Sequence, residues 1–133
     1  MRKVALALLL TITSVPAIAQ SVNVKLLQKS LNEWQPLNIR EEQNIITVTM
    51  KEPQITPDFY DFVASQGICS PLWLDDKKDL YLKNTKEVRI LNKFNAFGYV
   101  LETPRAICDE AGKAQPKESK VLILSKTRLF MGK

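Results

Sequence analysis

The sequence predicts a small α+β domain in which an N-terminal helix precedes a β-α-β-β-α-β order. Three observations support this class: an amphipathic helical pattern near the start, several short runs rich in β-branched residues, and two Thr-Pro pairs that each precede a glycine. The order is that of the ferredoxin-like, split βαβ fold, so we expect a four-stranded antiparallel sheet with two helices on one face. Because the last predicted helix is short, an irregular small α+β domain is the alternative.

The N-terminal segment, residues 1–19, has the pattern of a secretory signal peptide. It begins with Arg2 and Lys3, continues with an apolar run over Val4–Ile12, and closes with an A-x-A cleavage site. The apolar run is shorter than the roughly 20 residues that a membrane helix needs, although a retained anchor is the alternative. We therefore expect a cleaved Sec-type signal peptide, a single domain over residues 20–133 with no membrane span, and a periplasmic or secreted location.

Residues 22–35 have the pattern of an amphipathic helix. Apolar residues recur at spacings of three or four, which places them on one helical face: Val24, Leu27, Leu31 and Trp34. Ser21 or Asn23 can cap this helix, and Pro36 ends it. We expect the helix to pack on the core through its tryptophan, and a docking helix for a partner is the alternative.

A half-buried strand is predicted over residues 44–52. Its apolar residues, such as Ile46 and Val48, alternate with threonine and lysine, and most of them are β-branched. This alternation places the apolar side chains on one face of a sheet.

The best-marked helix is predicted over residues 56–67. Thr56 can cap its start, Pro57 fits the first helical position, and Gly67 is a plausible stop. The buried stripe of this helix is expected to comprise Phe59, Phe62 and Val63.

The next segment, residues 69–85, has no clear period. Pro71 argues against a continuing helix, and Trp73 is flanked by two leucines. We expect a short hairpin or a loop packed by its own aromatic side chains. The charged run over residues 75–79 lacks the regular ligand spacing of a calcium loop, so we interpret it as a solvated turn.

A β-hairpin is predicted from two apolar runs, 88–91 and 99–101, that enclose asparagines and Gly98. The turn between them contains two aromatic residues, and a hairpin tip has little core to bury them. We therefore predict a partner-binding site here, because interfaces are enriched in aromatic residues. The candidate partner-binding residues are Lys93, Phe94, Asn95 and Phe97, together with Trp73 in the preceding loop. Local packing is the alternative interpretation for both places.

A second short helix is predicted where Thr103 caps, Pro104 starts and Gly112 stops a helical run. A polar loop follows. The unbroken apolar run over residues 120–125 then predicts a strand that is covered on both faces. Residues 126–133 are expected to continue this strand or to fray.

The two cysteines, Cys69 and Cys108, are predicted to form a disulfide. An even number of cysteines in an exported chain favours pairing, and neither flank carries a CxxC redox motif. In the split βαβ order the two helices run antiparallel, which brings Cys69 at the end of the first near the start of the second. Closing a loop of this size contributes roughly 4 kcal/mol. Free or catalytic thiols are the alternative.

The composition excludes several classes of function. The chain has 19 basic and 14 acidic residues, and removing Arg2 and Lys3 leaves 17 against 14, a weak net charge of +3. The absence of histidine excludes His-based triads, and with only two cysteines it argues against a zinc site. Four glycines leave no phosphate-binding loop. We therefore expect no metal, no cofactor, no catalytic residues and no nucleic-acid partner.

These features predict an exported, non-catalytic binding protein that contacts another envelope or secreted protein. Inhibitors, immunity-type proteins and envelope accessory proteins belong to this class. One alternative is a small periplasmic enzyme that uses carboxylates, such as Asp109 with Glu110 or Asp75 with Asp76, although adjacent helical carboxylates do not face each other. The other is a weak binder of anionic surfaces or nucleic acid, which the low charge disfavours. The oligomeric state stays open.

Overall fold

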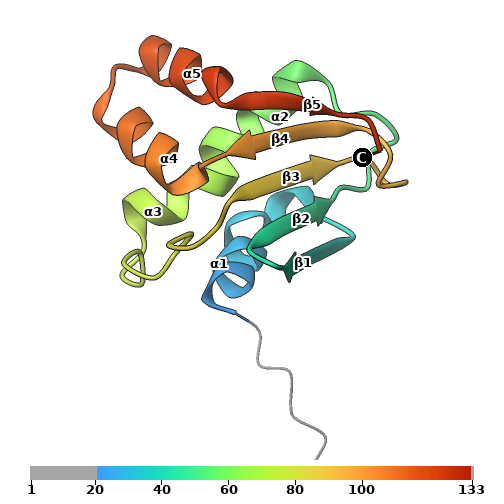
Figure 1. Ribbon diagram of the computed structural model, residues 1–133, viewed down its shortest axis with the longest axis horizontal. Coiled ribbons are helices and arrows are strands. Elements are labelled where there is room, and N and C mark those ends of the chain that lie inside the picture. Colours follow the sequence, from blue (N-terminus) through green and yellow to red (C-terminus); the bar gives the residue numbers. More distant parts are fainter. Residues whose placement is uncertain (1–20, 133) are drawn as a thin grey trace, which may run out of the picture.

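The computed structural model describes residues 21–132, so the predicted signal peptide lies outside the described part of the chain. Helices pack against a single sheet, as Figure 1 shows. In chain order the described elements are α1 (Val22–Ser30), η1 (Asn32–Trp34), β1 (Asn38–Glu42), β2 (Ile45–Thr49), α2 (Pro57–Phe62), η2 (Val63–Cys69), α3 (Ser70–Leu74), β3 (Glu87–Leu91), β4 (Gly98–Glu102), α4 (Pro104–Lys113), α5 (Pro116–Ser125) and β5 (Thr127–Phe130).

The sheet has five strands in the order β1-β2-β3-β4-β5. β2 and β3 are parallel, and the other neighbours are antiparallel. The α+β class is confirmed, but the four-stranded antiparallel, ferredoxin-like sheet is wrong. In the split βαβ order another strand lies between the two parallel strands, whereas here α2, η2 and α3 return the chain to β3 directly beside β2.

Strand β1 was not predicted from the sequence. Four of its five residues are polar in the segment NIREE, so it shows only one apolar position, Ile39. The chain enters β2 through Gln43 and Asn44, whose φ angles of 51° and 64° are both left-handed. A two-residue type I′ hairpin turn requires this backbone, and it usually contains glycine. The sequence of this segment therefore has neither the apolar alternation of a half-buried strand nor the glycine that a type I′ turn usually contains.

The core lies between the sheet and the helices. Alternation along β2 and β3 directs fully buried side chains to the helix side, among them Val48 and Ile90. The predicted apolar face is confirmed at Leu27 in α1 and at Leu31 directly after it, which are both fully buried. The predicted burial of Phe62 is wrong, since this side chain is 59% exposed, with its ring in a T-shaped arrangement 5.9 Å from the Trp34 ring.

The helix that begins at Pro57 does not stop at Gly67, and the hairpin or loop expected after residue 69 is wrong as far as Leu74. The helix continues through the π-helical segment η2 into α3. Pro71 has no N–H to donate to the carbonyl of Gly67 four residues earlier. The Ser30 hydroxyl donates to that carbonyl at 2.8 Å, and the Tyr81 hydroxyl donates to the next one, at Ile68, at 2.6 Å. Donors from distant segments therefore allow the helix to pass a proline.

The strand predicted over residues 120–125 is also wrong, because this run forms the second half of α5. Pro116 occupies the first turn of the helix, a position that suits proline. An unbroken apolar run is compatible with either element, and here Ile123 is buried while Val121 and Leu124 are exposed. The strand follows as β5, in the segment expected to continue or fray.

The predicted disulfide between Cys69 and Cys108 is confirmed, with a Cα–Cα distance of 5.1 Å. Both cysteines are fully buried. The bridge joins the last residue of η2 to the middle of α4, a helix that starts at Pro104 as predicted but passes Gly112 to end at Lys113. The packing of these two helices, and not a ferredoxin-like arrangement, therefore brings the sulfurs together.

Candidate partner-binding surface

The five candidate partner-binding residues lie at two separate places. Lys93, Phe94, Asn95 and Phe97 form the turn between β3 and β4. Trp73 belongs to α3, which Figure 1 shows at the opposite end of the sheet from that turn. The structure therefore does not bring the two candidate regions together, and each is described by itself.

Trp73 takes part in packing of the fold. Its indole nitrogen donates a hydrogen bond to the carbonyl of Cys108 at 2.8 Å, and the ring is largely buried. The indole packs so closely on Gly112 that any Cβ at that position would overlap it. Trp73 thus holds α3 against α4 beside the disulfide, which corresponds to the alternative interpretation of local packing.

A single buried asparagine organises the β3–β4 turn. The Asn92 side chain is 3% exposed, and its Oδ1 accepts from the backbone N–H groups of Ala96 and Phe97 at 3.0 and 3.3 Å. Its Nδ2 donates to the carbonyl of Pro53 at 3.0 Å. One side chain therefore closes the turn from within and ties it to the segment that precedes α2.

Two further contacts fix the outer part of the turn. The Lys93 N–H donates to the carbonyl of Glu52 at 3.0 Å, and the Thr49 hydroxyl donates to Asn95 Oδ1 at 2.5 Å. Asn95 has a left-handed backbone with φ of 55°, a conformation that asparagine tolerates better than most residues. The turn is therefore anchored to β2 and to the β2–α2 connection as well as to its own strands.

Phe94 and Phe97 are exposed on this anchored turn, at 67% and 57% of their surface. The Lys93 ammonium lies 5.0 Å from the centre of the Phe94 ring, in cation–π range. We call Lys93, Phe94, Asn95 and Phe97 the hairpin surface. It combines two accessible aromatic side chains with one cation on a backbone that hydrogen bonds hold in place.

The structure adds exposed apolar residues that the sequence reading did not select. Leu129 on β5 and Met131 just after it are 63% and 72% exposed. Gly98 pairs with Phe130, so Met131 follows the strand next to Phe97. The signal in the sequence is the short apolar run Leu129–Met131, which lies in the segment expected to continue the preceding strand or to fray.

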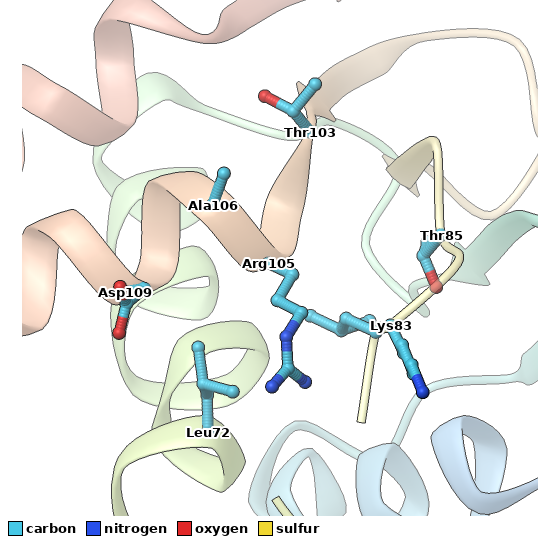
Figure 2. Close-up of a pocket in the computed structure, with 8 residues that line it drawn as sticks. Leu72, Lys83, Thr85, Thr103, Arg105, Ala106 and Asp109 are labelled. Carbon is cyan, nitrogen blue, oxygen red and sulfur yellow. The ribbon is translucent and has the colours of Figure 1, made fainter. Parts of the chain in front are cut away.

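Several hollows indent the described surface. One of about 510 Å³ lies between α4 and the segment before β3, and Figure 2 shows Arg105, Lys83, Thr85 and Asp109 around it. The Arg105 guanidinium donates to the carbonyls of Lys78 and Tyr81 at 3.0 and 2.6 Å. In Figure 2 the Lys83 ammonium points away from that guanidinium. Arg105 therefore binds the segment before β3 through its carbonyl groups. The Arg105 and Lys83 side chains do not point toward a common ligand position.

Two of the four carboxylates considered for catalysis, Asp109 and Asp75, have local partners. Asp109 forms an ion pair with Lys113 one turn along α4 at 3.1 Å, and Asp75 Oδ1 accepts from the Lys77 N–H at 2.9 Å. Among residues 21–132, no group of three or more His, Cys, Asp or Glu side chains is placed to hold a metal ion. Within the same residues, no helix has the length and apolar character needed to cross a bilayer.

The face of the sheet without helices carries arginines that are paired with glutamates. Arg89 contacts Glu87 at 2.6 Å, and Arg128 contacts both Glu87 at 3.0 Å and Glu102 at 2.8 Å. Arg89 also lies over the Phe130 ring, 5.2 Å from its centre. These arginines are therefore largely neutralised within the sheet.

No protein-family model, no curated protein and no solved structure matches this chain.

Proposed function

We propose that this chain is an exported, non-catalytic binding protein that holds another envelope or secreted protein through the hairpin surface. Inhibition of the partner, protection against it, or its assembly into a larger machine would all be served by such contacts. The observation that carries the proposal is the exposure of Phe94 and Phe97 on a turn whose backbone is hydrogen-bonded to the buried Asn92 side chain.

The hairpin surface is preorganised for binding. Aromatic side chains dominate the binding energy of many interfaces because each one removes a large apolar area from water. Ordering a mobile loop would subtract from that gain. Here Asn92 and Asn95 already hold the turn in the free protein, so binding would mainly restrict the two phenylalanine side chains.

The surface also indicates what the partner should offer. The partner should have an apolar cleft that accepts the two aromatic rings. It should also have a carboxylate at the rim of that cleft, where it can pair with the Lys93 ammonium beside Phe94. Pairing at an exposed rim affects the association rate and its salt dependence more than the affinity. We therefore expect association to slow at high ionic strength while the apolar contact persists.

The test is capture of a partner from envelope extract, followed by binding measurements with purified components. Phe94→Ala and Phe97→Ala should each weaken binding by about tenfold or more, as expected for residues that contribute at least ~1.4 kcal/mol. Phe62→Ala is the matched control, because Phe62 is 59% exposed but lies on α2. A partner that binds the double variant as tightly as the unaltered chain would disprove the assignment.

A further inference from the structure

Among residues 21–132, no strand pairs with the outer edge of β5. The Glu102 N–H donates to the carbonyl of Lys126, and Leu101 pairs with Thr127. In an antiparallel pair, residues alternate between those bonded to the neighbouring strand and those whose backbone points away. Thr127 and Leu129 therefore direct their backbone groups outward, and Met131 follows the same alternation.

Side chains along this edge provide little protection against pairing. Natural proteins usually protect edge strands with charges, proline or bulges. β1, at the other edge of the sheet, follows this rule, since three of its five residues are charged in NIREE. β5 and the residue after it, TRLFM, contain one charge, and Leu129 and Met131 are more than half exposed. The sheet thus has one protected and one unprotected edge.

We propose that β5 pairs antiparallel with β5 of a second copy of this chain, so that the protein forms a twofold dimer with a continuous sheet. A single register pairs all three outward-facing residues. Leu129 meets Leu129 of the second copy on the twofold axis, and Thr127 meets Met131 of the second copy. Such a self-complementary contact is the usual form of a symmetric dimer interface.

The distribution of charge along β5 supports pairing with a second copy of the chain. The register places Arg128 opposite Phe130 of the second copy, so the one cation of the strand faces an aromatic ring and not another cation. Phe130 already accepts the Arg89 guanidinium over its ring, 5.2 Å away. Glu87 and Glu102 neutralise Arg128 within each copy. Pairing of two identical strands therefore brings no like charges face to face.

The dimer does not depend on the proposed partner, because the hairpin surface lies beyond the end of β5. Antiparallel pairing would place the two hairpin surfaces at opposite ends of the joined strands, where Phe97 lies one strand away from the contact between Met131 and Thr127 of the second copy. A failure of partner binding in the Phe94→Ala variant would leave self-association unchanged, and loss of the dimer would leave a monomer with an intact hairpin surface. The two ideas can therefore fail separately.

The experiment is measurement of the mass of the purified protein by sedimentation and light scattering over a range of concentrations. The unaltered protein should have twice the mass of one chain, and Leu129→Lys should have the mass of one chain, because two cations then meet on the axis. Glu42→Lys, a charge change on the protected edge, should remain dimeric. A monomer at every concentration, or a dimer that survives Leu129→Lys, would overturn the proposal.

A second experiment tests the pairing of Leu129 with Leu129 of the second copy. It also tests the dimer itself if the Leu129→Lys variant does not fold. Paired residues in an antiparallel sheet have Cα atoms about 5.5 Å apart, a separation that a disulfide can bridge. Under mild oxidation Leu129→Cys should form a covalent dimer, since position 129 meets itself. Met131→Cys is the matched control and should not, since position 131 meets Thr127 of the second copy. Cross-linking of Met131→Cys in preference to Leu129→Cys would refute the register.

Discussion

At the scale of single residues, several side chains act through distant neighbours that the local sequence does not show. Gly67 was predicted to stop a helix, but its role is to let α1 approach η2, since a Cβ there would overlap the Leu31 side chain. Gly112 plays the same part for Trp73. In both cases the missing side chain provides space and the backbone remains helical.

Ser30 provides a test of how the chain tolerates Pro71. Removing its hydroxyl leaves the buried Gly67 carbonyl without its donor, and we expect Ser30→Ala to lower the free energy of unfolding by about 1–3 kcal/mol. Ser125→Ala is the matched control, because the Ser125 hydroxyl donates to an exposed carbonyl of its own helix. Urea denaturation checks both variants. Equal stability of the two would show that the Ser30 contact contributes little.

At the scale of elements, the cross-over between β2 and β3 is one interrupted helix that the disulfide ties to α4. Cys69 is the last residue of η2, and Trp73 follows it by one turn with its own hydrogen bond to α4. The two contacts act on the same pair of helices. The charged Lys120–Asp61 pair at 3.5 Å links α5 to α2 on the same side of the sheet, although a partly exposed pair contributes little.

Loss of the disulfide should affect stability much more than the local structure. The bridge closes a loop between residues 39 apart, for which chain entropy gives roughly 4 kcal/mol. We expect the double variant Cys69→Ala, Cys108→Ala to unfold at a correspondingly lower urea concentration while it keeps its helical circular dichroism at low temperature. The unaltered protein with its disulfide reduced is the control, because it lacks the bond but keeps both sulfur atoms. Unchanged stability in both samples would contradict the expectation.

At the scale of the whole molecule, the sheet separates two kinds of surface. One face carries the helices and a core that is fully buried at many positions, and the other carries the paired arginines and glutamates over a small apolar cluster of Leu91, Val100 and Phe130. Because the helix-free face neutralises its own charge, the accessible apolar groups near the hairpin surface and the β5 edge stand out. The hairpin surface lies at one end of β3 and β4, and the proposed dimer contact runs along the outer edge of β5.

Two buried tyrosines make the stability of the molecule depend on pH in the alkaline range. Burial raises the pKa of Tyr60 and of Tyr81 well above the usual value, and their hydroxyls bond to Thr127 and to the Ile68 carbonyl. The unfolded chain loses these protons near pH 10, whereas the folded chain keeps them. Above about pH 10 the free energy of unfolding should therefore fall by about 1.4 kcal/mol per pH unit for each tyrosine.

Urea denaturation between pH 9 and pH 11 measures this fall. Below pH 9 neither phenol should contribute any pH dependence, since both are protonated in both states. The double variant Tyr60→Phe, Tyr81→Phe should show a shallower decline, while Tyr99→Phe, which keeps both buried hydroxyls, should follow the unaltered protein. A decline of the same steepness in the double variant would mean that other groups cause it.

The sequence by itself determined the features that depend on local chemistry or on covalent pairing. These are the α+β class, the starts of the helices at Pro57 and Pro104, the β3–β4 hairpin with its aromatic turn, and the disulfide. Each follows from a cap, a fixed proline φ, an alternating pattern or an even cysteine count, which a few neighbouring residues specify. The same local patterns also identified the candidate residues of the hairpin surface.

Only the tertiary structure decided the features that depend on distant partners. The passage of the helix through Pro71 required donors from Ser30 and Tyr81, and the strand order required β3 to pair directly with β2. The apolar run before Ser125 fits a helix or a strand equally well, and packing alone assigned it to α5. The same packing left Leu129 exposed on an open edge, because hydrogen bonding and burial between remote segments are not encoded in any single stretch of the chain.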